Sequence, residues 1–552
     1  MSKADIIITN ANIYTLSWDD PSNEGIPAEN APFKNDKWNY DAQAIAIKGN
    51  KIVYVGSIED VLDYKASYTK TINAKGSIII PGLIESHGHL QEIGEKNEAI
   101  KLQTLSKEEI IDMVVKRSKV VPKGEWIIAS GWDEALFAND YPDMNLLSDQ
   151  TPDHPIVLVG LRGFGVMGNI LAFEKAGITK EIEAKDGGEI LKDSVGELRY
   201  ILLNQSKKLL LDKIPQKSLE QRTRIMNYGY KKLMKMGYTS THNLGVDKYH
   251  MEVYEDLLKK DQLPMRTHAF IAARMYNLDE INRWLEKGPT NDDESFLQVK
   301  NFKGYYDGSL GSRGAEFLEE YSDKKGHTGV GGEAYGFYDD LVRKAMDKGF
   351  QMAIHAIGDK ANRKVLDFYE DYFKINPESK QLRHRIEHAQ VVHSDDFPRF
   401  AELNIIASME PAHALEDMPW AISRIGMQRA KGAYAWRTLR ENNVKVIFNS
   451  DFTGSDPSFF YGMYSAITKN KKGTDKIYFP EQAFTKEETL RAYTIWSAYA
   501  SHQENLTGTI EVGKWADLTF IDVDILNAKP EEILKGTVLK TMINGKVVYE
   551  KK

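Results

Sequence analysis

Two histidines separated by one residue follow a run of aliphatic side chains. Residues 79–89 read Ile-Ile-Pro-Gly-Leu-Ile-Glu-Ser-His-Gly-His. Because residues i and i+2 of a strand project from the same face, His87 and His89 are expected to point the same way. Two neutral imidazoles can hold one ion of the Zn, Fe, Ni or Cu type. Alone, the pattern fits equally well two histidines that make unrelated hydrogen bonds.

Four further side chains that can bind a metal fall at predicted strand ends. They are Lys303, His355, His388 and Asp451, separated by 52, 33 and 63 residues. A β-α unit takes about 30 residues or more, so the gaps fit one enlarged unit, one unit and two units. Catalytic residues of barrels come from the carboxyl ends of several strands. The set therefore predicts a metal site at the rim of a barrel.

The middle of the chain, residues 81–500, alternates strand runs with helical patterns, as in a parallel α/β fold. Eight strand ends are predicted, the number that closes a (β/α)8 TIM barrel. They lie at 87–89, 239–242, 266–271, 297–303, 351–355, 383–388, 404–409 and 445–451. Residues 91–237 exceed one crossover, so we expect an inserted subdomain there, with strands at 126–130 and 156–160 and a helix near 198–211.

Both chain ends read as short strands. The N-terminal ones are predicted at 5–9, 12–16, 43–48 and 51–55, and the C-terminal ones at 517–522 and 539–550. Neither end can bury a core alone, so residues 1–80 plus 501–552 are predicted to form one β-sandwich domain. The polar segment 18–39 between the first strands is expected to be a surface loop.

Composition excludes several classes of protein. The 552 residues are 42% hydrophobic and 28% charged, which is a globular composition. The net charge of −8 gives no basic footprint for nucleic acid or an anionic membrane. With no cysteine, a metal must be held by nitrogen and oxygen. No signal peptide or membrane segment is evident, so we expect a soluble cytoplasmic protein with a small-molecule substrate.

Residues 81–89 resemble the opening signature of the amidohydrolase superfamily of metal-dependent hydrolases. Residues 303–313, 355–359 and 383–388 resemble its family 3 branch, which includes N-substituted formamide deformylases. Segments 237–242, 449–451 and 513–518 fit as well, so the match runs nearly end to end.

The resemblance implies a role for each metal-competent residue. His87 and His89 would bind one ion, and His355 and His388 a second. Lys303 matches a lysine that is commonly carboxylated and bridges two ions; the alternative is an unmodified lysine ion-paired beside a single metal. Asp451 would touch metal and shuttle the proton. Zinc, as one or two ions, is the expected cofactor.

Other residues are expected to contact substrate or orient it. His242, at a strand end, could act in catalysis by stabilising an oxyanion, or make a structural hydrogen bond. Glu387 should face away from the ligand His388 and form a structural ion pair. The residues predicted to bind substrate are Asp307, Arg313, Glu410, His413 and Trp132.

Three positions depart from the family pattern. Glu85 stands where Asp is usual, Phe164 where His is common, and Glu410 where Gln is frequent. None removes a predicted metal ligand, but all bear on the substrate. A carboxylate at 410 would favour a cationic substrate group or shift a nearby pKa.

The predicted activity is hydrolysis of a non-peptide C–N bond, in an amide, formamide or cyclic amide, by metal-activated water. A deaminase or C–O hydrolase on the same core is the alternative, and a non-catalytic binding protein is a third. A homodimer is also expected as a possibility from the resemblance, although no interface can be read from the sequence.

Overall fold

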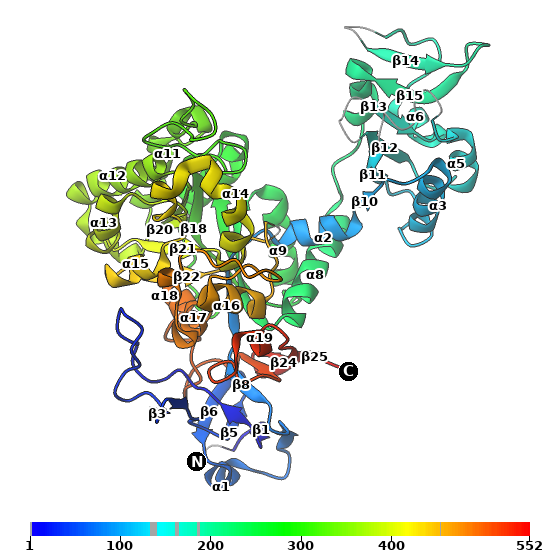
Figure 1. Ribbon diagram of the computed structural model, residues 1–552. Coiled ribbons are helices and arrows are strands. Elements are labelled where there is room, and N and C mark those ends of the chain that lie inside the picture. The colour runs from blue at the N-terminus through cyan, green and yellow to red at the C-terminus, as the bar shows by residue number, and fades with distance from the viewer. Residues whose placement is uncertain (1–2, 133–140, 161–164, 185–187, 453) are drawn as a thin grey trace. The chain divides into compact units, whose positions relative to one another are not determined.

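The computed structural model describes residues 3–132, 141–160, 165–184, 188–452 and 454–552 (Figure 1). The chain divides into two compact units. Unit 1 contains Met1–Ile93 and Arg222–Lys552, and unit 2 contains Gly94–Gln221. Each unit has hydrophobic clusters of its own. The candidate metal residues all belong to unit 1.

Eight parallel strands form the barrel of unit 1, in sheet order β22-β21-β20-β19-β18-β17-β16-β9. Their bounds are β9 Leu83–Gly88, β16 Tyr238–Val246, β17 Arg266–Ala272, β18 Leu297–Tyr305, β19 Gln351–Ala356, β20 Arg385–His388, β21 Ile406–Met409 and β22 Val446–Phe448. A parallel bridge between Gly88 and Phe452 joins the two edge strands. All eight predicted strands are present, and the predicted barrel is confirmed.

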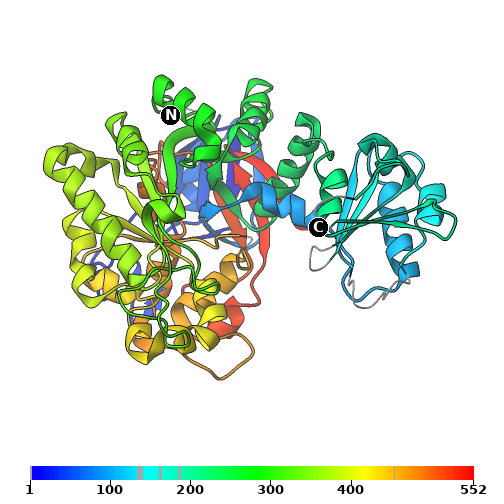
Figure 2. The same ribbon diagram turned by 90° about the horizontal axis from the view of Figure 1, so that it is seen from above.

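Helices surround the barrel, as the view from above shows (Figure 2). Those that follow its strands include α8 Leu219–Lys235, α9 Lys248–Lys259, α10 Leu278–Lys287, α11 Asp339–Asp347, α12 Asp359–Ile375, α13 Phe397–Glu402, α14 Pro411–Ala430, α15 Trp436–Glu441, α16 Phe459–Thr468, α17 Lys486–Ala492 and α18 Ile495–Ala500. Helices such as α9 and α12 bury apolar side chains against the sheet, as an amphipathic helix packed on a sheet does.

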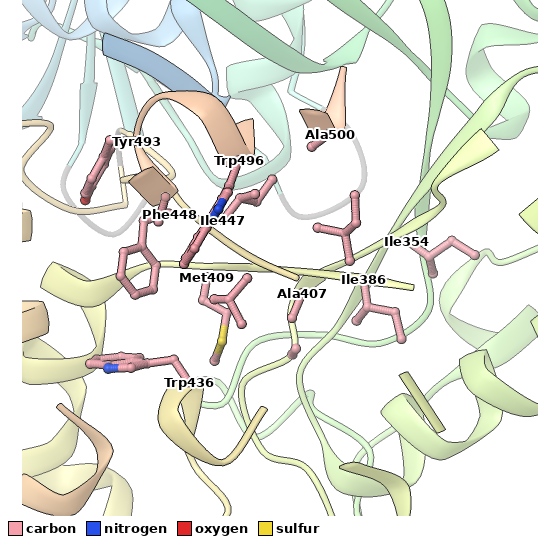
Figure 3. Close-up of a cluster of buried hydrophobic side chains, with 14 of the residues drawn as sticks. Ile354, Ile386, Ala407, Met409, Trp436, Ile447, Phe448, Tyr493, Trp496 and Ala500 are labelled. Carbon is pink, nitrogen blue, oxygen red and sulfur yellow. The ribbon is translucent and has the colours of Figure 1, made fainter. Parts of the chain in front are cut away.

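The strand register separates apolar from polar side chains. Ile354 pairs with Ile386, and Ile386 with Ala407, so these residues form one row across three strands. They belong to a buried cluster that includes Trp436 and Trp496 (Figure 3). Because side chains alternate along a strand, the next row, His355, Glu387 and Ser408, faces the opposite way, into the barrel.

Strands from the two chain ends share one sheet. Its order is β2-β8-β23-β24-β25, with β2 Asn12–Ile13, β8 Ile78–Pro81, β23 Leu518–Ile521, β24 Val538–Ile543 and β25 Lys546–Glu550. A second sheet, β6-β5-β1-β7, comprises β1 Ile6–Thr9, β5 Ala44–Lys48, β6 Lys51–Gly56 and β7 Lys70–Asn73. Ile8 and Ile45 of one sheet and Ile79 and Phe520 of the other lie in a common buried cluster.

The segment 18–39 is more than the surface loop expected. It contains a small hairpin, β3 Phe33–Lys34 and β4 Lys37–Trp38. The buried Trp18 indole donates to Glu487 at 2.7 Å, and the Arg491 guanidinium donates to the Trp18 carbonyl at 2.8 Å. These two partners on α17 hold the segment against the barrel.

Unit 2 is built on a six-stranded sheet, in order β10-β11-β12-β13-β15-β14. The strands are β10 Ile100–Lys101, β11 Ile127–Trp132, β12 Ile156–Gly160, β13 Gly165–Gly168, β14 Glu189–Lys192 and β15 Leu198–Leu203; the helices include α3 Lys107–Ser118, α5 Met144–Gln150 and α6 Ile170–Ala176. Unit 2 ends at Gln221, so most of α8 falls in unit 1, whereas the predicted subdomain runs over 91–237.

The helix expected near 198–211 was wrong for residues 198–203, which form the strand β15. β15 pairs antiparallel with β13 and β14, and only η2 Asn204–Lys207 and α7 Lys208–Leu211 are helical. A short apolar run does not distinguish a strand from a helix, and here pairing with β13 buries Ile201 and Leu202. Across the described ranges, the structure has no helix with the length and apolar character needed to cross a bilayer.

Candidate metal centre

His87, His89 and Asp451 meet at the carboxyl end of the barrel. The Oδ1 atom of Asp451 lies 3.5 Å from His87 Nε2 and 3.1 Å from His89 Nε2. One ligand atom from each residue falls within 4.8 Å of the other two. The Asp451 side chain is 18% exposed and that of His89 is 27% exposed, so the group is accessible from one side.

Backbone bonds that close the barrel position this group. Asp451 donates its N–H to the His87 carbonyl at 3.0 Å, and His89 donates to the Phe452 carbonyl at 2.9 Å. A Cβ at Gly88 would come within 2.4 Å of the Phe452 ring. The residue between the two histidines is therefore glycine where the strands approach most closely.

Both histidines donate a hydrogen bond from Nδ1. His87 Nδ1–H donates to Glu387 Oε2 at 2.6 Å, and His89 Nδ1–H donates to the Leu244 carbonyl at 3.1 Å. Such bonds leave the Nε2 lone pair directed at the site, which is how proteins orient metal-binding imidazoles. Glu387 was expected to make only a structural ion pair. It does pair with Arg385, at 2.7 Å, but it also reaches the site through His87.

His355 and His388 lie beside these residues. The His388 ring centroid is 5.1 Å from that of His87 and 4.5 Å from that of His355. His388 Nδ1–H donates to Glu410 Oε2 at 3.1 Å. His355 Nε2 is buried, has no hydrogen-bond partner in the described part of the chain, and lies 3.6 Å from Asp307 Oδ1. The structure thus brings four predicted histidine ligands together.

Lys303 is buried at the end of β18, in the electrostatic field of the same cluster. Burial lowers the pKa of its amine to about 8, against the opposing effect of the Glu387 and Asp451 carboxylates. The Lys303 charge is in turn among the causes that lower the pKa values of His87 and His355. With this lowered pKa, part of the Lys303 amine is neutral near pH 8.

The electrostatics suit a cation-binding group. Burial and the Lys303 charge lower the pKa of His87 to about 3, so its imidazole is neutral, as a metal ligand must be. Burial raises the pKa of Asp451, but His87, His89 and His388 bring it well below its usual value, so Asp451 is ionised. Burial lowers the pKa of His89, but the hydrogen bond and charge of Asp451 raise it overall. Imidazole nitrogen and carboxylate oxygen, without any thiolate, match the donors that zinc accepts.

Arg385 is the central residue that the sequence did not reveal. Its fully buried guanidinium donates to both oxygens of Glu387, to the Ser86 carbonyl at 2.7 Å and to Ser408 Oγ at 3.1 Å. It also donates to His242 Nδ1 at 3.0 Å. The signal in the sequence was the spacing of Arg385 and Glu387, which places both on one face of β20.

His242 accepts that bond deep in the barrel and is fully buried. Burial, with the neighbouring His268 and Arg385, lowers its pKa well below the usual value. Its Nε2 has no hydrogen-bond partner among the described residues. In this structure His242 supports Arg385, which corresponds to the structural alternative, and the catalytic role stays a prediction.

Two residues predicted to contact substrate make hydrogen bonds that hold the loop after β18. Asp307 is fully buried and accepts from the N–H groups of Glu316 at 2.8 Å, Ile357 at 3.0 Å and Gly358 at 2.9 Å. Arg313 forms a bidentate pair with Asp323, at 3.1 and 2.8 Å. Both side chains hold the loop, Asp307 also lies 3.6 Å from His355 Nε2, and their contact with substrate stays a prediction.

Of the remaining expectations, Trp132 lies fully buried in the core of unit 2, where its indole donates to the Leu158 carbonyl at 2.9 Å. It is a core residue of that unit, and its contact with substrate stays a prediction. Phe164 lies outside the described residues. Glu85 is buried and accepts from the Ser450 N–H at 3.0 Å and hydroxyl at 2.7 Å, which ties β9 to the segment before Asp451.

Comparisons with known proteins identify the family of the chain. A model described as the amidohydrolase family matches residues 70–549. The protein YtcJ of Bacillus subtilis (strain 168) is 30% identical over 523 residues, covering 92% of this chain and 96% of YtcJ. The N-substituted formamide deformylase of Arthrobacter pascens is 23% identical, covering 99% of this chain and 98% of the deformylase.

Solved structures share the fold. An uncharacterized metal-dependent hydrolase from Pyrococcus furiosus matches with a TM-score of 0.71 and 23% identity, covering 95% of this chain and all of the other. The atrazine chlorohydrolase TrzN from Arthrobacter aurescens, complexed with zinc, matches with a TM-score of 0.52 and 15% identity over 99% and 95% of the two chains. With the family model spanning nearly the whole chain, this protein belongs to the amidohydrolase family and is a metal-dependent hydrolase.

Proposed function

We propose that the protein hydrolyses a non-peptide C–N bond of a small molecule, in an amide, formamide or cyclic amide. The observation that carries the proposal is the convergence of His87, His89 and Asp451 within 4.8 Å at the open end of the barrel. The similarity to a protein named as an N-substituted formamide deformylase supports the bond type.

The residues divide the work between holding a metal and moving a proton. His87, His89 and Asp451 would hold one divalent ion, with zinc as the candidate, and His355 and His388 a second. When bound, such an ion lowers the pKa of water from 15.7 to about 7 and polarises a carbonyl group. Asp451 accepts the proton of the attacking water on a carboxylate oxygen and returns it to the leaving nitrogen.

We further propose that Lys303 carries a carbamate. Its burial disfavours the ammonium form, and the neutral amine is the form that reacts with CO2. A carbamate would supply two anionic oxygens where a cation would repel metal. Mass and 13C NMR measurement of protein prepared in 13C-bicarbonate tests this; an unmodified lysine in fully metal-loaded, active protein would contradict it.

The decisive experiment combines a substrate panel with metal analysis. Protein reconstituted with zinc is assayed for amine release from N-formyl, N-acetyl and cyclic amide compounds, and its ions per chain are counted. We expect hydrolysis that a chelator abolishes and zinc restores. Ammonia release or alcohol release without amide cleavage would instead favour the deaminase or C–O hydrolase alternative.

A further inference from the structure

Two buried polar atoms in the first turn of α14 lack partners in the described part of the chain. Glu410 occupies the N-cap position of α14, directly after β21, and is 1% exposed. Its Oε2 accepts from His388, but its Oε1 is buried without a hydrogen bond. His413, three residues further along, has its Nδ1 buried without a partner as well.

The two atoms have opposite hydrogen-bonding character. Glu410 is a carboxylate, so Oε1 can only accept. Burial lowers the pKa of His413, but its contact with Asp417 at 3.3 Å and the field of Glu410 raise it to about 9, so Nδ1 carries a proton and donates. Asp417 is itself held by the Tyr434 hydroxyl at 2.7 Å and by Gln390 at 3.4 Å. The imidazole ring is therefore fixed on its Nε2 side.

Glu410 lies against the predicted metal ligand His388, and His413 follows it three residues later on α14. Residues three apart near the start of a helix lie on the same side, about 5–6 Å apart at Cβ. Glu410 touches the ring of His388, and the Asp451 carboxylate is among the charges that act on His413. Buried polar atoms need hydrogen-bond partners, so these two atoms would be satisfied by a ligand that offers a donor to Glu410 and an acceptor to His413.

We propose that Glu410 and His413 select the substrate. Resting on the proposed hydrolase function, this assigns the substrate class as N-acyl compounds whose non-reacting part carries an N–H donor next to a carbonyl or carboxylate oxygen. The N–H donates to Glu410 Oε1, and His413 Nδ1–H donates to the oxygen. Hydrolysis then breaks the acyl C–N bond, with the water oxygen joining the acyl carbon and a proton leaving on the amine.

Three isosteric formamides test the proposal. N-Formylglycinamide has the donor and the acceptor, N-formylaminoacetone has the acceptor alone, and N-formylisobutylamine has neither. For the wild-type zinc enzyme, kcat/KM should fall about 10- to 100-fold at each step, as expected when a hydrogen bond to a charged group is lost. The third compound serves as the internal reference for metal loading in every variant.

Two variants test which residue causes each of the two falls in kcat/KM. In Glu410→Gln, the amide oxygen can accept from His388 and the NH2 then stands in the place of Oε1, so the preference for the glycinamide over the ketone should fall to about one or invert. His413→Phe should remove the preference for the ketone over the isobutyl compound. Glu416→Gln, a carboxylate change in the same helix, should leave both ratios unchanged.

The outcomes separate this inference from the proposed function. Equal wild-type rates on the three compounds overturn the selectivity assignment and leave the hydrolase function standing. Wild-type ratios that persist in Glu410→Gln and His413→Phe also overturn it. If neither these compounds nor the wider amide panel is hydrolysed by zinc-loaded protein, the proposed function fails, and the substrate class fails with it.

Discussion

At the residue scale, the metal centre is defined as much by what stands behind the histidines as by the histidines themselves. His87, His89 and His388 each donate from Nδ1, to Glu387, to the Leu244 carbonyl and to Glu410. Such outer partners fix the ring orientation and raise the basicity of the metal-binding nitrogen. Metal affinity should therefore respond to these outer partners as well as to the histidines themselves.

Asp451→Asn tests the proton-transfer role. The amide keeps the shape of the side chain but cannot accept a proton, so kcat for amide hydrolysis should fall at least 100-fold. Asp456→Asn, an exposed change in the same segment, provides the control for folding. Steady-state kinetics with circular dichroism checks this; a kcat within tenfold of wild type would remove Asp451 from catalysis.

Glu387→Gln tests the support of His87. Loss of the carboxylate weakens the hydrogen bond from His87 and leaves Arg385 less well paired, so zinc affinity should drop about 10- to 100-fold. Competition with a chromogenic chelator measures the change, and Glu402→Gln, at an exposed position of α13, is the matched control. Equal affinity in all three proteins would show that Glu387 is a structural ion pair only.

At the element scale, side chains along each barrel strand alternate between the two faces of the sheet. Polar site residues therefore face the barrel interior, and apolar residues pack against the surrounding helices. The row Ile354, Ile386 and Ala407 packs toward Trp436 and Trp496, while Glu387 faces inward.

The end of α16 places a lysine in the protein interior. Lys469 caps α16 fully buried, 3.7 Å from the Trp436 ring, and donates to the Tyr434 carbonyl at 3.3 Å.

Lys469→Met should stabilise the protein, and more at low pH than at high pH. Burial lowers the Lys469 pKa to about 7, whereas an unfolded lysine has a pKa near 10.5. Between these values the unfolded chain binds more protons, so wild-type stability rises with pH across this window. Removing the lysine should add about 1–4 kcal/mol to the free energy of unfolding below pH 7.

The measurement is the thermal unfolding midpoint at pH 6 and at pH 9.5. The gain from Lys469→Met should be largest at pH 6 and shrink by pH 9.5, while the exposed Lys472→Met should show no such trend. A gain that does not depend on pH would mean that Lys469 titrates normally in the folded protein.

At the scale of the whole molecule, the barrel depends on both chain ends. β8 passes directly into β9, which carries His87, and β8 pairs antiparallel with β23 from the C-terminal region. A buried pair joins the same two parts, since Arg266 at the start of β17 donates to Asp517 at 2.8 Å. The sheet formed by the two chain ends is therefore joined to the barrel of unit 1 by the chain connection from β8 to β9 and by this ion pair.

Asp517→Asn should destabilise unit 1 strongly. Arg266 is 1% exposed and would lose its charged partner, which costs about 3–5 kcal/mol for a buried pair. Glu550→Gln removes a partner of the exposed Lys540 pair and should change stability by about 1 kcal/mol or less. Denaturant unfolding of the two variants compares them; equal effects would mean that the Arg266–Asp517 pair does not couple the terminal sheet to the barrel.

Much of the barrel and of the candidate ligand set could be predicted from the sequence. Strand periodicity and the spacing of Lys303, His355, His388 and Asp451 are local properties, and parallel strands bring their carboxyl ends to one rim whatever the side chains are. Residues 198–203 were less certain, because a short apolar run fits either a helix or a strand until a partner strand is known.

What the tertiary structure alone decided is which groups touch. The His87–Glu387 bond joins residues 300 apart, and the Arg385 guanidinium connects Ser86, His242 and Glu387 from three strands. Such contacts depend on strand register and barrel closure, which no local pattern encodes. The sequence by itself determined the class of chemistry through the residue types at strand ends, and the folded barrel decided how Glu387, Glu410 and Arg385 hold them, because only closure brings distant strands within hydrogen-bonding distance.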